Sequence, residues 1–525
     1  MRSWLRLPVA FAAGVLLACC FAPIGWWFLT PVPIAVFALL VRGQKIRWAV
    51  GIGAAFGYGF VGLLCHWMTV LGVDAWIVLT LFYGSFWALV GLLWWATMRT
   101  RVWPLWSAAA YVSVETLWTL VPWGGFPWAR LAFTTPGHAP QGLAAIGGEA
   151  FVSFAVALSA LLLAWAVQRT FDAAKSRASR RELTLKLIPA GLALLLAWLI
   201  PASGALVQTP IVGEGQGAQT VEAAAVQGNV PRLGLNFDTQ ASAVLNNHIA
   251  ETMRLAQSIN AGTTPAPDFV LWPENSSDVD PYTSTAAQQE ISAAVNAVNA
   301  PTLIGSYVDD PLDPTKFFNV SIEWLPHGDN PPPIGSPRTY IKQQPVPFGE
   351  RLPFRAFLTK FIKRFDRVPR DMVSGTKPGV LQLGPARVGN VICFEVAYDR
   401  LVRNVVRAGG RLITVQTNNA TYGKTGQPQQ QLAMSQLRAV EYDRAVLIAA
   451  TSGISAVILP NGHIVAQTKE FTAATLVARL PLRSNLTWAA LYGAWVSAII
   501  TILGLLGVIL GAARRKTPAG AGHDR

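Results

Sequence analysis

Three side chains in the second half of this 525-residue chain could together carry out acyl transfer through a thioester: Cys393, Glu274 and Lys342. Cys393 ends the strand-like run VGNVIC, Glu274 follows FVLWP, and Lys342 follows RTYI. In open α/β architectures reactive side chains gather at the C-terminal ends of strands. Cys393 would attack a carbonyl, Glu274 would take the thiol proton as general base, and Lys342 would stabilise the oxyanion. This chemistry requires no metal and no cofactor.

Cys393 differs from the other three cysteines, because Cys19, Cys20 and Cys65 lie in stretches apolar enough to sit in lipid. The helix-like run YDRLVRNVVRAG follows it, so we expect a helix dipole and free N–H groups to favour the Cys393 thiolate. Its polar part of the chain contains no second cysteine for a disulfide. The alternative is a small buried hydrophobic residue, which is how most strand cysteines behave.

The segment that carries these residues alternates strands with helices. Its strand-like runs are DFVLWP, TLIGSYV, FFNVSIEWL, VGNVICF, RLITVQT, AVLIAAT, SAVILP and TLVARLP. Helical stretches are expected near 239–259, 284–299, 398–408 and 429–442, and a linker, GEGQG, is expected at 213–217. Such alternation favours a layered α/β domain over an all-β one.

The remainder of the chain is predicted to lie in a membrane, because 52% of all residues are hydrophobic and only 13% are charged. Apolar runs of roughly 17 to 25 residues are typical of transmembrane helices. They fall near 8–22, 24–41, 49–71, 76–98, 104–121, 150–168, 185–202 and 487–511. We therefore expect a seven-span domain at 1–205, a globular domain at 206–486, an eighth span at 487–512 and a basic tail at 513–525.

Basic residues predict the orientation of these eight spans. They cluster in alternate gaps, namely Arg2 and Arg6; Arg42, Lys45 and Arg47; Arg99 and Arg101; Arg169 to Lys186; and Arg514 to Lys516. By the positive-inside rule both termini are cytoplasmic and the globular domain is extracytoplasmic. These flanks also explain much of the net charge of +14, so we expect no nucleic-acid partner.

The motifs LWPE, YIKQQPVPFGE and GNVICFE resemble those of the nitrilase superfamily. Together with the apolar spans and GGFPWARLAF at 124–133, they are similar to the apolipoprotein N-acyltransferases of the bacterial inner membrane. The resemblance implies an αββα sandwich with catalytic Glu274, Lys342 and Cys393. It also implies a ping-pong reaction: an acyl chain passes from a glycerophospholipid to Cys393, then to the α-amine of a lipoprotein's N-terminal diacylglyceryl-cysteine.

The resemblance assigns supporting roles to residues near these three. Glu350 and Glu395 are expected to orient Lys342 and to hold the active-site loops, although a carboxylate near Lys342 could also serve only to neutralise charge. Phe394 stands where the family often has Tyr, and Thr421 where it has Trp. A phenol and an indole are therefore missing, which affects substrate positioning.

Candidate substrate contacts are Asn418, Asn419, Tyr422, Phe357 and Phe361. The two asparagines could instead be turn formers. The two phenylalanines belong to LPFRAFLTKFIKRFDRVPR at 352–370, whose aromatic and basic residues recur at helical spacing. Such a basic amphipathic helix would either pack on the core or lie in the lipid headgroup layer as a lid.

Three charged residues of the apolar region need partners, because a charge in lipid is costly unless paired. Arg130 lies between Glu115 and Glu149 in sequence, so we expect an ion pair that holds spans together, with binding of a lipid headgroup as the alternative.

Two rival functions fit parts of this pattern. A membrane-tethered amidase would use the same three catalytic residues and resolve the thioester with water. A transporter or scaffold with an inactive outer domain would need polar residues along the spans, and few are present. We expect a monomer, because the reaction needs one site.

Overall fold

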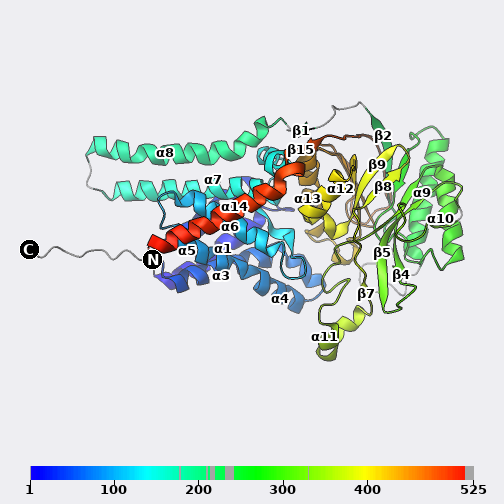
Figure 1. The fold of residues 1–525 in the computed structure, drawn as a ribbon, viewed down its shortest axis with the longest axis horizontal. Helices are drawn as coiled ribbons and strands as arrows, with labels where there is room; N and C mark the ends of the chain where they lie inside the picture. The colour runs from blue at the N-terminus through cyan, green and yellow to red at the C-terminus, as the bar shows by residue number, and fades with distance from the viewer. Residues whose placement is uncertain are drawn as a thin grey trace, which may run out of the picture. The chain divides into compact units, whose positions relative to one another are not determined.

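The computed structural model describes residues 2–176, 179–208, 211–212, 219–230, 242–328 and 330–514 (Figure 1). The chain forms two compact units, Met1–Pro210 with Leu491–Arg525, and Ile211–Ala490. The linker predicted at 213–217 and most of the tail predicted at 513–525 lie outside the described residues.

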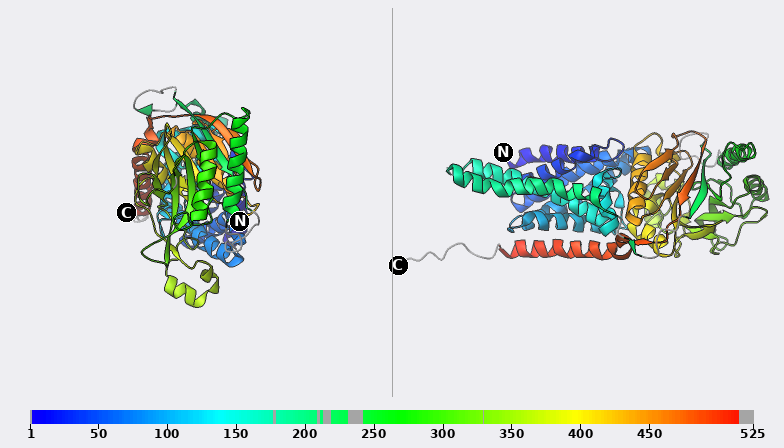
Figure 2. Two further views of the ribbon diagram at one scale, coloured as in Figure 1. Left: turned by 90° about the vertical axis from the view of Figure 1, so that its right-hand side faces the viewer. Right: turned by 90° about the horizontal axis from the view of Figure 1, so that it is seen from above.

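The first unit is helical, and its helices run side by side (Figure 2). They are α1 (Arg6–Cys19), α2 (Pro31–Val41), α3 (Ile46–Leu64), α4 (Val73–Gly84), α5 (Phe86–Thr97), α6 (Trp103–Trp118), α7 (Ala144–Ala174), α8 (Arg180–Ala202) and α14 (Trp488–Ala513), whose first residues belong to the second unit. Within the described residues, five segments are long and apolar enough to cross a membrane: Ile46–Leu64, Val73–Thr97, Ala139–Ala174, Arg181–Leu206 and Trp488–Ala513.

Three of the eight predicted spans correspond to helices that are not among these five segments. Helices α1, α2 and α6 have 14, 11 and 16 residues. The apolar run at 24–41 includes a turn and a short 3-10 helix, so α2 begins only at Pro31, a residue suited to the first helical position. Hydrophobicity alone does not separate such apolar turns from the helices that they join.

The charged residues of the first unit pair as expected. The Arg130 guanidinium lies 2.9 Å from a Glu149 carboxylate oxygen and 3.8 Å from one of Glu115, and all three side chains are buried. Glu115 also accepts a hydrogen bond from the backbone N–H of Leu131 at 2.9 Å. Both carboxylates are therefore neutralised within the protein, which fits the ion pair better than a headgroup site.

The second unit contains two large sheets. One has the order β14-β2-β3-β4-β5-β6, with β7 paired to β5, and the other has the order β13-β12-β11-β10-β9-β8. The first sheet comprises β2 (Thr220–Gln227), β3 (Phe269–Leu271), β4 (Thr302–Asp309), β5 (Lys316–Trp324), β6 (Thr339–Ile341), β7 (Asp371–Met372) and β14 (Ala474–Pro481). The second comprises β8 (Val380–Leu383), β9 (Ala386–Ile392), β10 (Leu412–Thr417), β11 (Val446–Ala450), β12 (Ala456–Ile458) and β13 (Ile464–Gln467). A further pair joins β1 (Ile211–Val212) to β15 (Leu486–Thr487).

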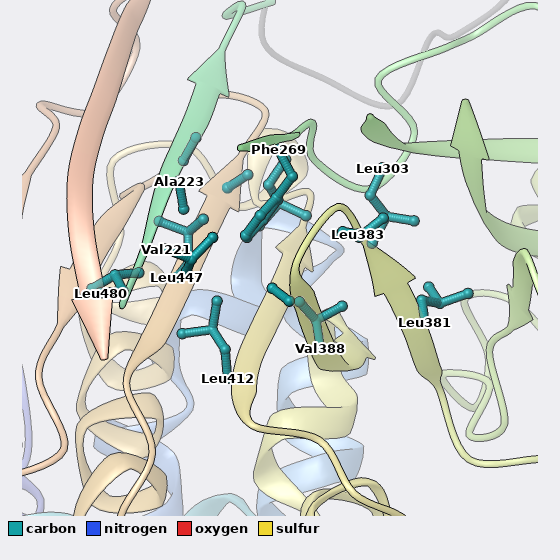
Figure 3. Packing of buried hydrophobic residues seen from close by; sticks show 14 of the residues in the cluster. Val221, Ala223, Phe269, Leu303, Leu381, Leu383, Val388, Leu412, Leu447 and Leu480 are labelled. Carbon is teal, nitrogen blue, oxygen red and sulfur yellow. The ribbon is translucent and has the colours of Figure 1, made fainter. Parts of the chain in front are cut away.

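The two sheets pack face to face over one apolar core (Figure 3). This core includes Val221, Phe269 and Leu303 from one sheet and Val388, Leu412 and Leu447 from the other. Helices α9 (Ala243–Asn260) and α10 (Thr285–Val298) cover the outer face of the first sheet. Helices α12 (Asp399–Arg407) and α13 (Gln427–Tyr442) pack on the second sheet. The layers are therefore α, β, β and α, as the resemblance implied.

A polar contact links the two sheets near the ends of their parallel strands. Gln416 of β10 donates from its amide to the carbonyl oxygen of Trp272, at 2.7 Å, and accepts from the Ser321 hydroxyl of β5 at 2.5 Å. Buried polar groups of this kind are well satisfied only in one arrangement. The contact fixes β10 against the residue two positions before Glu274.

Candidate active site

Cys393 lies at the sharp turn that follows β9. Its φ angle is +54°, in the left-handed region that costs energy for a residue other than glycine. A 3-10 turn, Cys393–Ala397, follows directly, and α12 begins only at Asp399. Because β9 and β10 are parallel with Ile392 opposite Gln416, the next residue of β10, Thr417, lies beside Cys393.

The environment of the Cys393 thiol differs from the sequence-based expectation. Burial, and after it the negative charge of Glu274, raises its pKa to about 12, although the positive charge of Lys342 opposes both effects. The prediction that a helix dipole favours the thiolate was wrong, because desolvation outweighs the single turn that follows the strand. At neutral pH the thiol is protonated and requires a base.

Glu274 and Lys342 belong to one buried cluster with Glu350 and Asn319. The Lys342 ammonium donates to Oε1 of Glu274 at 2.9 Å and to Oε1 of Glu350 at 2.8 Å. The Asn319 amide donates to the same two oxygens, at 2.8 and 3.0 Å. All four side chains are less than a tenth exposed. Two donors and two carboxylate oxygens therefore hold one another in place.

The charges in this cluster suit a base and an oxyanion partner. Burial alone would lower the pKa of Lys342, but Glu274 and Glu350 outweigh burial and hold that pKa well above its usual range. Lys342 thus remains an ammonium. The second oxygen of Glu274, Oε2, accepts the backbone N–H of Asn418 at 3.0 Å and lies outside the Lys342 contacts. A carboxylate oxygen can accept more than one hydrogen, so Oε2 is the atom available to take a proton.

Glu395 binds the main chain rather than Lys342. Its carboxylate accepts the backbone N–H groups of Gln343 at 2.6 Å, Gln344 at 3.0 Å and Ile392 at 2.8 Å, and the Tyr340 hydroxyl at 2.8 Å. Burial raises its pKa, and the bond from Ile392 is the largest opposing effect. Glu395 therefore ties the Cys393 turn to the segment that carries Lys342. Glu350 alone of the two supporting carboxylates hydrogen-bonds to Lys342.

The remaining predicted residues near Cys393 are two asparagines, which form hydrogen bonds within the protein, and two aromatic residues. Asn418 contributes its backbone to Glu274, and its side chain accepts the N–H of Ala420 at 3.1 Å, as a turn former does. The Asn419 amide donates to two buried glutamine side chains at 2.8 Å each. Phe394 packs edge-on against Tyr398, with ring centroids 5.1 Å apart. Tyr422 lies close enough to Cys393 that the charge of the thiolate, after burial, raises its pKa.

The stretch at 352–370 is less regular than its spacing predicted. Helix α11 covers only Arg355–Phe361, because the chain turns to an extended conformation at Ile362 before a second short turn. The ring centroids of Phe357 and Phe361 are 5.0 Å apart, and the two residues are 64% and 65% exposed. The core-packing alternative is excluded for these two rings.

Sequence reasoning missed Asn319 and Thr417. Asn319 interrupts the apolar run FFNVSIEW, and it is fully buried in β5. A buried polar residue within an apolar strand usually has a specific partner, and this signal could have identified it. Thr417 ends β10 as Cys393 follows β9, but its position became evident only from the register of the two strands.

Among the residues that the structure describes, no three His, Cys, Asp or Glu side chains come together as metal ligands would. The site consists instead of a thiol, an ammonium, two carboxylates and neutral hydrogen-bonding groups. These are the components of acyl transfer through a covalent intermediate.

Both units match sequence models of known families. Residues 13–162 match the apolipoprotein N-acyltransferase N-terminal domain, and residues 223–489 match the carbon-nitrogen hydrolase family. The chain is 37% identical over 517 residues to an apolipoprotein N-acyltransferase of Mycolicibacterium smegmatis, covering 95% of this chain and 84% of that protein. It is 28% identical over 535 residues to an apolipoprotein N-acyltransferase of Pseudomonas putida, covering 98% of each. Among solved structures, an amidase of the nitrilase superfamily from Nesterenkonia has a TM-score of 0.37 and 17% identity, covering 54% of this chain and 99% of that one.

Proposed function

The chain belongs to the apolipoprotein N-acyltransferase family, and from this premise we propose how Cys393, Glu274 and Lys342 perform the reaction. The activity is acyl transfer from a phospholipid donor to a lipoprotein acceptor, so the rival readings as a hydrolytic amidase and as an inactive scaffold are not favoured. The observation that carries the proposal is the buried cluster of Glu274, Lys342 and Glu350, whose charges act on the Cys393 thiol.

In the first half-reaction Cys393 takes an acyl group from a glycerophospholipid. Glu274 accepts the thiol proton at Oε2 while the sulfur attacks the ester carbonyl carbon. The oxyanion that forms receives a hydrogen bond from the Lys342 ammonium, which the two carboxylates keep charged. The ester C–O bond then breaks, and the lysophospholipid oxygen takes the proton from Glu274. An acyl thioester on Cys393 remains.

In the second half-reaction the α-amine of the acceptor's diacylglyceryl-cysteine attacks the thioester. Glu274, again a carboxylate, accepts a proton from the amine as the new C–N bond forms. Lys342 stabilises the oxyanion a second time. The C–S bond breaks, and the Cys393 sulfur recovers its proton from Glu274. The products are an N-acylated lipoprotein and an enzyme in its starting state.

We propose that 1–205 contributes seven spans and 487–512 an eighth, and that 206–486 is the catalytic domain. The chain is a membrane protein, which the five long apolar segments and the acyltransferase relatives support. We place the catalytic domain outside the bacterial inner membrane and both termini in the cytoplasm. Contacts between segments predicted to be cytoplasmic support this orientation of the spans. Arg514 donates to the carbonyl of Arg99 at 3.1 Å, and the Arg42 guanidinium lies 5.5 Å from the centre of the Trp103 ring. We further propose that the enzyme acts as a monomer.

We propose that the exposed rings of α11 contact the acyl chains of lipid. Phe357 and Phe361 carry their apolar surface outward, and Lys360 beside them is a cation suited to a lipid phosphate. Exposed apolar surface of this kind is unfavourable in water and becomes favourable when it is buried in a lipid interface.

A two-acceptor assay tests the proposed function. Purified protein in phospholipid vesicles is incubated with a peptide carrying an N-terminal diacylglyceryl-cysteine, or with the same peptide acetylated at its α-amine. We expect mass spectrometry to show one added acyl chain on the free-amine peptide alone, and none with Cys393→Ala. Release of free fatty acid without acylated peptide would refute the proposal and favour hydrolysis.

A further inference from the structure

The Thr417 hydroxyl contacts the sulfur of Cys393. Its Oγ1 lies 3.3 Å from Sγ in a hydrogen-bonding geometry, and the residue is 2% exposed. The contact follows from the fold, because Thr417 and Cys393 each come directly after the paired residues Gln416 of β10 and Ile392 of β9. No water needs to enter for the hydroxyl to reach the sulfur.

The surroundings of Thr417 direct its hydrogen toward the sulfur. The Gln431 amide donates to Oγ1 at 3.1 Å, which fixes the acceptor side of the hydroxyl. The other acceptors in reach, the side-chain oxygens of Asn419 and Gln431, lie at 3.4 and 3.3 Å. Those distances are long for bonds between two oxygens, which are typically about 2.7–2.8 Å. The distance of 3.3 Å from Oγ1 to the Cys393 sulfur is short by comparison, because sulfur is a larger acceptor atom than oxygen.

Among the described residues, charges of both signs act on the Cys393 sulfur. The negative charges of Glu274 and Glu350 both disfavour the thiolate. Lys342 is the positive group, and it is shared between those two carboxylates. Tyr422 contributes a neutral phenol. A neutral donor that points at the sulfur therefore supplies stabilisation that the ionic groups do not.

We propose that Thr417 is a further catalytic residue, which donates its O–H hydrogen bond to the Cys393 sulfur when the thiolate forms and when it leaves the thioester. The Thr417 proton stays on Oγ1 throughout, and Glu274 carries the transferred proton. The bond is stronger to a thiolate than to a thioester sulfur, because charge on the acceptor strengthens a hydrogen bond. Thr417 thus favours the charged sulfur in both half-reactions. The inference rests on the proposed role of Cys393 as nucleophile.

The test compares a variant of Thr417 that loses the hydroxyl with one that retains it. Thr417→Val keeps the shape, and Thr417→Ser keeps the hydroxyl. Thr414→Val is the matched control, because Thr414 is a buried threonine of the same strand whose hydroxyl bonds to Asn390 at 2.8 Å. The rate of Cys393 alkylation by iodoacetamide is followed against pH in the full-length protein, by mass spectrometry of the Cys393 peptide. Acyl-adduct formation from phospholipid vesicles is measured in parallel.

We expect Thr417→Val to slow alkylation and acylation by about tenfold or more at fixed pH and to move the alkylation profile to higher pH, as the loss of a hydrogen bond to a charged group predicts. Thr417→Ser should restore both rates, and Thr414→Val should keep the wild-type profile. An unshifted profile in Thr417→Val, or equal loss in Thr417→Ser, would overturn the proposal. If Thr417→Val does not fold, Thr417→Ala against Thr417→Ser isolates the hydroxyl. A wild-type enzyme that forms no adduct on Cys393 would instead refute the proposed function.

Discussion

Replacing Asn319 with leucine should slow acylation of Cys393 strongly in a protein that still folds. The side chain donates from one nitrogen to Oε1 of both Glu274 and Glu350, the two atoms that also receive Lys342. Its own carbonyl oxygen is buried and finds no hydrogen-bond partner among the described residues. Leucine has the same branched arrangement of four side-chain heavy atoms and removes both donated bonds together with that unsatisfied oxygen.

The size of the effect follows from these two bonds. A hydrogen bond to a charged group contributes about 1.5–3 kcal/mol, so the pair contributes about 3–6 kcal/mol. Removal of the unsatisfied carbonyl offsets about 1–3 kcal/mol in stability. It offsets nothing in the placement of the two carboxylates. We therefore expect a barrier about 3 kcal/mol higher, which is about a 100-fold slower acylation.

The assay is a single-turnover measurement of acyl-adduct formation on Cys393 by intact-protein mass spectrometry, with thermal unfolding followed in parallel. Asn485→Leu is the matched control, because Asn485 is buried and donates to the carboxylate of Asp443 at 2.8 Å, away from the catalytic cluster. That variant should lose stability and keep its acylation rate. A folded Asn319→Leu enzyme that acylates within threefold of wild type would refute the claim that Asn319 positions the carboxylates.

Two further predictions concern charge and lipid contact. Glu274→Gln removes a negative charge that raises the pKa of Cys393, so alkylation of the thiol by iodoacetamide should shift to lower pH. Acyl transfer should fall by at least about 100-fold, because the general base is lost. A shift of the alkylation profile to higher pH would contradict the predicted sign. The double variant Phe357→Ser with Phe361→Ser should slow acylation from vesicles several-fold. The rate with a soluble short-chain ester donor and the unfolding temperature should stay unchanged, since both rings are exposed. Equal loss of rate with both donors would count against lipid contact.

The sequence predicted the catalytic domain well because its signals are local. Within the described residues, the eight strand-like runs and the four helical stretches form the expected elements, since strand and helix periods are visible in short windows. Glu274, Lys342 and Cys393 could be selected from the sequence because each follows a strand-like run. Glu274 and Lys342 follow β3 and β6 of one sheet and Cys393 follows β9 of the other, so only the packing of the two sheets brings them together. The positions of Asn319 and Thr417 depend on which strands are neighbours, which no single window contains.

Other features depend on tertiary burial, which the sequence does not show directly. The pKa of Cys393 is governed by desolvation and by Glu274, which lies 119 positions earlier in the chain, rather than by the adjacent helix. Helical spacing at 352–370 was visible, but spacing alone does not say whether Phe357 and Phe361 face a core or the outside. The apolar runs continue through turns rich in aromatic residues, so run length overestimated the length of α2.

The measurement that tests the mechanism most directly is detection of the acyl-enzyme. Purified protein is mixed with phospholipid in the absence of acceptor, digested, and analysed by mass spectrometry before and after neutral hydroxylamine. A thioester at Cys393 predicts an acyl adduct on that residue alone, lost on hydroxylamine treatment and discharged by an acceptor with a free α-amine. Acyl transfer that proceeds in Cys393→Ala, or an active enzyme whose Cys393 never carries an acyl group, would contradict the account.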